Sequence, residues 1–170
     1  GDTRNIFGVG SSGFDLRLNN DIMYVSPTIA GVSASAAYRT TDATEDSDVG
    51  GGSLLWTYKQ EGKDVLTLGV ACEQHGTMVS GTDTNLDGKV DVPSAEKELG
   101  IRFAVLSTLG SLQLNAMYET LRNNMGVDGA DRNTVGGGAA YDIGKTTLKA
   151  QYYVSDDTDG KPDTGASMVA

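Results

Sequence analysis

Apolar and polar residues alternate one by one along several stretches of this chain, and this alternation limits its possible folds more than any other feature. Within residues 32–39, the sequence VSASAAYR places valine, alanine or tyrosine at every second position. The same period recurs at 66–73, 112–119 and 147–154. Because a strand points successive side chains to opposite faces, the pattern predicts β-strands with one apolar and one polar face.

Nine strands are expected along the chain, and the connections between them alternate between two kinds. The expected strands are 21–26, 32–40, 51–60, 65–76, 97–108, 111–122, 134–143, 146–154 and 166–170. The tight connections are 27–31, 61–64, 109–110 and 144–145. The long, acidic connections are 41–50, 77–96, 123–133 and 155–165. This order predicts an all-β, antiparallel up-and-down meander with tight turns at one end and long connections at the other.

The expected polar faces carry charges that a dry protein interior would not hold cheaply. These charges are Arg39, Lys59, Arg102, Glu119 and Lys149. The apolar faces carry Tyr38, Tyr118 and Tyr152, each near the strand end that enters a long connection. A transmembrane β-barrel accounts for both observations, because its strands are apolar outside and polar inside, with aromatic residues near the interfaces. The alternative is a soluble barrel or sandwich with half-buried tyrosines.

Composition excludes several classes of function. The 170 residues carry a formal net charge of −10, which argues against nucleic acid as a partner. The single cysteine, Cys72, cannot form an intrachain disulfide, and one cysteine with one histidine disfavours a zinc site. No nucleophile, base and orienting acid are grouped in the sequence, so we do not expect an enzyme.

The stretch DTNLDGKVDVPS, residues 83–94, matches the first nine positions of an EF-hand-like calcium loop. The oxygen ligands would come from Asp83, Asn85, Asp87, Lys89 (through its backbone carbonyl) and Asp91. Position 12 is Ser94 where a bidentate glutamate is expected, and no convincing helices flank the loop. Calcium binding and an ordinary acidic surface loop both remain open, and no other cofactor is expected.

The N-terminal part of the chain resembles the general diffusion porins of Gram-negative outer membranes. The run GDTRNIFGVGSSGFDLRLNNDIMYVSPTIAGVSASAAY carries Gly1-Asp2-Thr3, then Arg17 and Tyr24, then the turn Ser26-Pro27 and the strand 31–38. Residues 136–152 (GGGAAYDIGKTTLKAQY) resemble the family's hairpins, which have a Gly/Ala-rich strand, a tight turn and an outgoing strand.

The resemblance implies a sixteen-stranded barrel, assembled as a homotrimer among outer-membrane lipid and lipopolysaccharide, that passes small hydrophilic solutes and ions. Residues 1–170 would form a single porin-like region, with the end of the constriction loop and the start of the following strand at 1–20 and meander strands at 21–170. Because bacterial barrels use an even number of strands, nine strands indicate an internal or incomplete portion of a larger barrel.

The resemblance also implies a charged constriction, where acids of an inward loop face basic residues of the wall. Asp2 is the acidic candidate, Arg17 is the wall candidate and Arg4 is an additional loop charge, while Arg39 and Arg102 would line the lumen. The alternative for each is an ordinary solvated charge. The alternative for the whole chain is a soluble or surface β-rich, calcium-binding structural or adhesive module.

Overall fold

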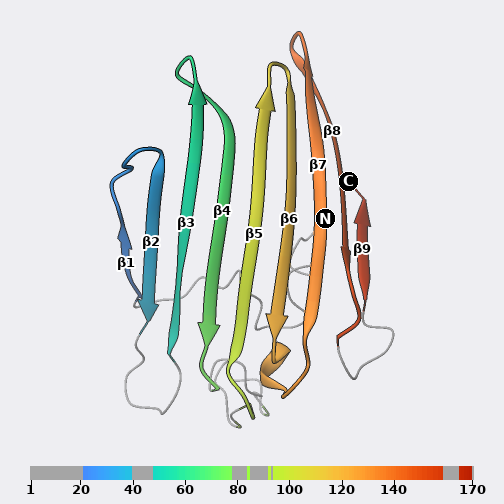
Figure 1. The fold of residues 1–170 in the computed structure, drawn as a ribbon. Coiled ribbons are helices and arrows are strands. Elements are labelled where there is room, and N and C mark those ends of the chain that lie inside the picture. Colours follow the sequence, from blue (N-terminus) through green and yellow to red (C-terminus); the bar gives the residue numbers. More distant parts are fainter. Residues whose placement is uncertain are drawn as a thin grey trace.

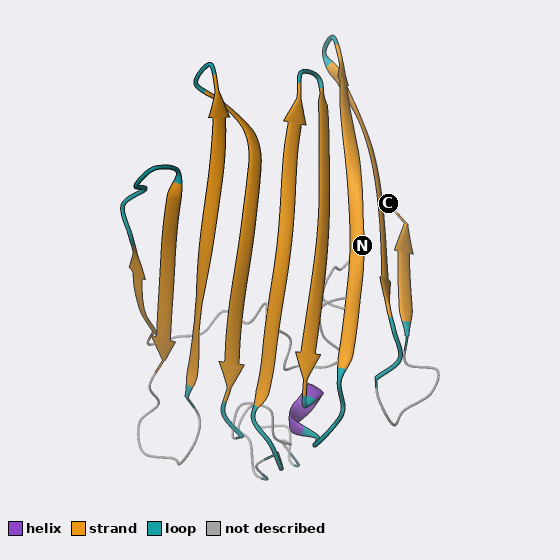
Figure 2. Ribbon diagram, in the orientation of Figure 1, coloured by secondary structure: helices purple, strands orange, loops and turns teal. Residues whose placement is uncertain are grey.

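A computed structural model describes residues 21–39, 48–77, 84, 92, 94–158 and 165–169, which form one antiparallel sheet with one short helix (Figures 1 and 2). The strands are β1 (Asp21–Val25), β2 (Val32–Arg39), β3 (Val49–Gln60), β4 (Lys63–His75), β5 (Glu98–Leu109), β6 (Leu112–Arg122), β7 (Arg132–Ile143), β8 (Thr146–Ser155) and β9 (Ala166–Val169). The single-turn 3-10 helix η1 (Asn124–Gly126) lies between β6 and β7. Among the described residues, no helix is long and apolar enough to cross a bilayer.

The sheet order follows the chain order from β1 to β9, so the expected all-β up-and-down meander is confirmed. Each strand pairs with its neighbours in sequence, and the sheet is not closed between β1 and β9. The expected strand bounds agree with the structure to within two residues. The strands β3, β4 and β7 begin two residues earlier than expected, at Val49, Lys63 and Arg132, because the strands beside them are long enough to continue the ladder.

Tight two-residue turns join β3 to β4, β5 to β6 and β7 to β8 at the same end of the sheet (Figure 1). Between β3 and β4, Glu61 and Gly62 have φ values of 52° and 78°, the pattern of a type I′ turn. Gly110 and Gly144, with φ of 63° and 61°, open the β5–β6 and β7–β8 turns, as a type II′ turn requires. These turns match the twist of the flanking strands and fix which residues face each other across each hairpin.

The register separates the side chains into an apolar face and a polar face, because residues directly opposite in a ladder share a face. One row on the apolar face crosses six strands through Leu54, Val70, Phe103, Tyr118, Val135 and Val154. The adjacent row lies on the polar face and consists of Ser53, Ala71, Arg102, Glu119, Thr134 and Ser155. The alternation in the sequence is therefore carried across the whole sheet.

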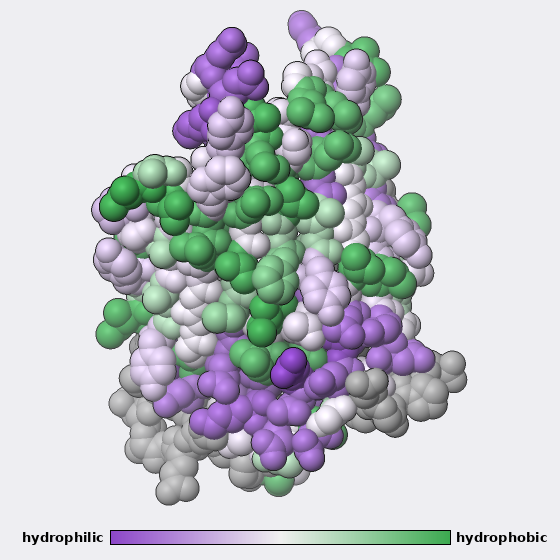
Figure 3. Space-filling view, in the orientation of Figure 1, coloured by the Kyte–Doolittle hydropathy of each residue, from purple (hydrophilic) through white to green (hydrophobic). Residues whose placement is uncertain are grey.

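The apolar side chains do not pack against one another in an interior. On the apolar face, Leu54, Phe103 and Val135 are 48%, 51% and 52% exposed. Among the described residues, the buried hydrophobic side chains are limited to Val49, Leu121 and Ala130. Figure 3 shows a broad hydrophobic band over the middle of the strands, with hydrophilic surface gathered toward the ends that carry the long connections.

Aromatic residues border this band at two levels. Tyr38, Tyr118 and Tyr152 lie toward the long connections, as expected from the sequence, and Trp56, Tyr58 and Tyr141 lie toward the tight turns. The Tyr38 hydroxyl donates to Asp48 at 2.7 Å, and the Tyr118 hydroxyl donates to Asn133 at 2.8 Å. Six residues along β6 and eight along β3 separate the two levels, or about 20–26 Å.

Candidate functional site

Ionisable side chains gather on the polar face near the long connections, in three successive register rows. We call this group the ionic belt; it consists of Arg39, Glu73, His75, Glu98, Arg102, Glu119 and Arg132. The strands β2, β4, β5, β6 and β7 supply these side chains. The belt contains three arginines and three glutamates, so these six charges balance, and the chain's excess of negative charge comes from other residues.

Arg102 and Glu119 form the best-defined ion pair of the belt. They lie directly opposite each other on β5 and β6, and Nε and Nη2 of Arg102 donate to the Oε2 atom of Glu119 at 2.7 and 2.5 Å. The glutamate side chain is 3% exposed, whereas the arginine side chain is 35% exposed. The pair therefore holds a guanidinium at the surface of the polar face against a buried carboxylate.

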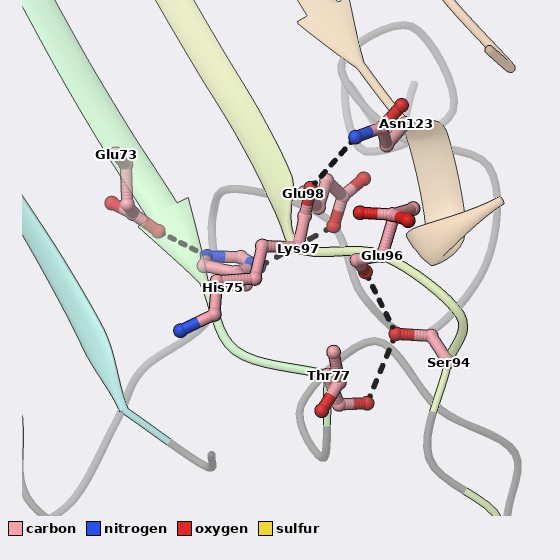
Figure 4. Close-up of polar contacts among 8 residues, drawn as sticks. All are labelled: Glu73, His75, Thr77, Ser94, Glu96, Lys97, Glu98 and Asn123. Carbon is pink, nitrogen blue, oxygen red and sulfur yellow. Dashed lines mark hydrogen bonds and ion pairs between the residues drawn. The ribbon is translucent and has the colours of Figure 1, made fainter. Parts of the chain in front are cut away.

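His75 lies between two carboxylates at the end of β4 (Figure 4). Its Nε2 atom is 2.5 Å from the Oε1 atom of Glu73, and its Nδ1 atom is 3.4 Å from the Oε2 atom of Glu98. Glu73 shares the strand and the face of His75, because it is two residues away, and Glu98 is its ladder partner on β5. The imidazole is fully buried, and the Glu73 side chain is 35% exposed.

Arg132 is buried at the start of β7, one row from Glu119. Its Nε atom donates to the Ser155 hydroxyl at 2.7 Å, and that hydroxyl also lies 2.7 Å from the Thr134 hydroxyl. The two terminal nitrogens of Arg132 have no hydrogen-bond partner in the described part of the chain. A buried guanidinium held by a single bond makes this corner of the belt sensitive to mutation.

A hollow of about 240 Å³ lies beside the belt. Small residues on the polar face form its floor: Ser35, Ala37, Gly51, Ser53, Ala71 and Gly100. Glu73, Arg102 and Glu119 stand at its margin. Because these side chains are small, the surface of the sheet is low here, and charged groups of both signs border the hollow.

The structure places two of the candidate lumen residues named from the sequence on the polar face. Arg102 stands in the ion pair above, and Arg39 ends β2 in the same row as His75 and Glu98. Asp2, Arg4 and Arg17 lie outside the described residues, so their positions at a constriction remain predictions. The part of the belt that sequence analysis did not name as a site is Glu73, His75, Glu98, Glu119 and Arg132.

The calcium-loop candidates also lie outside the described residues; they are Asp83, Asn85, Asp87, Lys89 and Asp91. The described residues contain no group of three or more histidine, cysteine, aspartate or glutamate side chains able to hold a metal. Calcium binding by residues 83–94 therefore stays a prediction.

The base of the connection between β4 and β5 is well defined (Figure 4). The backbone N–H of Ser94 donates to the Thr77 carbonyl at 2.9 Å, and its hydroxyl lies within hydrogen-bond distance of the Thr77 and Glu96 carbonyls. Glu96 also donates its N–H to the Gly126 carbonyl in η1 at 3.0 Å. Together these bonds close the base of this connection and join it to the neighbouring one.

A family model described as Gram-negative porin matches residues 1–170, the whole of the sequence. Comparison with curated proteins and with solved structures gave no match.

Proposed function

Because this chain belongs to the Gram-negative porin family, we propose that its sheet is part of the wall of a water-filled channel in the outer membrane. Small hydrophilic solutes and ions diffuse passively through this channel along the polar face. Assembly as a homotrimer, in contact with outer-membrane lipid and lipopolysaccharide, is part of the proposal. No chemical conversion of the solute is involved.

One observation carries the proposal: the hydrophobic side chains are exposed on one face, while the other face is charged. A water-soluble protein would bury residues such as Leu54 and Phe103, because exposing a large apolar surface to water is unfavourable. In a bilayer the same residues contact lipid tails. The aromatic residues at two levels support this arrangement, since outer-membrane barrels carry aromatic girdles on both sides of an apolar band about 25 Å tall.

The belt supports diffusion rather than strong selection between ions. Its arginines and glutamates balance, so their net charge does not strongly favour ions of either sign. Opposite charges placed side by side, as in Arg102 and Glu119, create a local field that orients dipolar solutes.

The native cysteine gives a direct test of the two faces. Cys72 is exposed and pairs with Gly52 and Ile101 on the apolar face, whereas its neighbour Ala71 points to the polar face. A nitroxide attached to Cys72 of the protein in vesicles should be accessible to oxygen, which concentrates in lipid. A nitroxide introduced by Ala71→Cys in a Cys72→Ser background should be accessible to a water-soluble nickel chelate. Equal accessibility at the two sites would refute the arrangement.

Conductance tests the channel itself. The protein, extracted with detergent from outer membranes and added to a planar lipid bilayer, should produce stepwise increases in ionic current. Unchanged current, with the protein shown to be inserted in the bilayer, would refute the function. A soluble calcium-binding module, the alternative considered from the sequence, would neither need detergent nor conduct.

A further inference from the structure

Glu73 places a partly exposed carboxylate at the margin of the hollow beside the ionic belt. Its side chain is 35% exposed and borders the hollow on the polar face. The Oε1 atom of this carboxylate lies 2.5 Å from the Nε2 atom of His75, whose imidazole is fully buried (Figure 4). His75 therefore acts on an ion in the hollow through its charge and its bond to Glu73, not by contact.

The described charged groups that face His75 come from three strands. Glu73 lies on the same strand, β4, and Glu98 of β5 places its Oε2 atom 3.4 Å from the Nδ1 atom of His75. On the other side, the ladder partner in β3 is the uncharged Val49. Beyond Val49, Arg39 of β2 ends the same row, two strands or about 10 Å away. Two close carboxylates thus outweigh one more distant cation.

Two further charges beside this row act on the opposite face. Asp48 accepts a hydrogen bond from the Tyr38 hydroxyl at 2.7 Å, and the charge of Lys97 acts on the same hydroxyl. Tyr38 lies on the apolar face, so these two charges are directed away from His75. The row of Tyr38 also contains Gln74, so His75 lies one residue beyond this aromatic level and outside the apolar band.

The two carboxylates keep His75 charged at neutral pH. Burial alone lowers the pKa of a histidine, because it disfavours the charged form. At His75, the hydrogen bonds and negative charges of Glu73 and Glu98 outweigh burial and raise the pKa from 6.5 to about 9. With this imidazolium the belt holds four positive and three negative groups, so Glu73 is not an isolated negative charge.

We propose that His75 lowers the preference of the channel for cations by neutralising the exposed carboxylate of Glu73. A passing ion meets the carboxylate and the imidazolium as a pair, and their fields largely cancel. Without the imidazolium, Glu73 presents an uncompensated negative charge, which attracts cations and repels anions. This inference rests on the proposed function, because it requires ions to pass along the polar face.

The reversal potential of the full chain, measured in a tenfold gradient of potassium chloride at several pH values, tests this role. A unit charge about 10 Å from a passing ion changes the ratio of cation to anion permeability by about twofold in 0.1 M salt. The native ratio should therefore rise by about twofold from roughly pH 7.5 to roughly pH 10.5, as His75 loses its proton. His75→Gln has no proton to lose at this position, so its profile should lack this step and keep only the changes caused by other titrating groups.

Glu73→Gln gives a second prediction, of the opposite sign. It removes the carboxylate and leaves the imidazolium beside Glu98, so the ratio of cation to anion permeability at neutral pH should fall by about twofold. Glu61→Gln, the same chemical change at the tip of the β3–β4 turn, should change the ratio much less. A purely structural role for His75 predicts neither the pH step nor this fall.

Heat-dependent migration in detergent gels identifies the folded protein for each variant. A native profile without a step that His75→Gln removes would overturn the inference, and so would an unchanged or higher ratio in folded Glu73→Gln protein; in both cases the conducting channel stands. If His75→Gln does not fold, the result for Glu73→Gln decides alone. If the native chain conducts no current at all, the channel is refuted, and this role of His75 is refuted with it.

Discussion

The ion pair between Arg102 and Glu119 gives the sharpest prediction, because one of its charges can be removed with almost no change of shape. Glu119→Gln replaces the buried carboxylate by an amide. Arginine cannot lose its proton in a protein, and the Arg102 side chain is 35% exposed on the polar face. The variant therefore leaves one uncompensated positive charge on the proposed channel wall.

The size of the effect follows from the Coulomb energy. At about 7 Å in water, a unit charge and a passing ion interact by roughly 0.6 kcal/mol, and screening in 0.1 M salt lowers this to roughly 0.3 kcal/mol. That energy enriches anions and depletes cations by about 1.7-fold each, so the ratio of cation to anion permeability should fall by about threefold. Low-dielectric walls focus the field, which makes this a lower bound.

The reversal potential in a tenfold gradient of potassium chloride measures the permeability ratio. The control is Glu61→Gln, the same chemical change at the tip of the β3–β4 turn, eight positions or about 26 Å along β3 from the row of Glu119. We expect the control to shift the ratio much less. The reasoning is wrong if folded Glu119→Gln protein, identified by heat-dependent migration in detergent gels, has the reversal potential of the native protein.

Three further predictions concern the belt and the long connections. Ser155→Ala removes the hydrogen bond of the buried Arg132 guanidinium and should lower the free energy of unfolding by about 1–3 kcal/mol, measured by urea titration in vesicles; an unchanged midpoint would contradict the assigned bond. Gly126→Ala places a Cβ 2.1 Å from that of Ser94 at a φ of 69°, so we expect faster proteolysis of the β4–β5 connection, and native resistance would argue against this packing. A peptide of residues 80–98 should bind calcium with measurable heat in isothermal titration, and a trace without heat would remove the calcium loop.

Much of the fold was predictable because tight turns set the register of each hairpin. Arg102 is eight residues before Gly110, and Glu119 is eight residues after Ser111, so a two-residue turn at 110–111 places the two charges opposite each other. Counting ten residues on each side of the turn at 144–145 brings Thr134 opposite Ser155. The turn expected at 144–145 is confirmed, so the pairing of Thr134 with Ser155 could be derived from the sequence. The turn expected at 109–110 lies one residue later in the structure, and counting from the expected position would have paired Arg102 with Met117.

Contacts across the long connections could not be derived in this way. His75 and Glu98 are ladder partners, but 22 residues separate them and no turn rule fixes a register over that length. The β3–β4 hairpin shows a second limit, because a register shift near Tyr58 and Lys59 places Leu55 opposite Gly69. Counting from the turn alone would miss this one-residue shift and assign the wrong partners.

The hydrogen bonds between Thr77 and Ser94 close the base of the β4–β5 connection, and this closure bears on which insertions the connection tolerates. The backbone N–H and the hydroxyl of Ser94 both bond to the Thr77 carbonyl, so the two ends of the β4–β5 connection are held together by bonds outside residues 78–93. Lengthening a loop with fixed ends costs little, with each doubling adding about 0.6 kcal/mol. Foreign peptides could therefore be grafted at this position for display while the strands on either side keep their register, and natural variation could accumulate there at the same low cost.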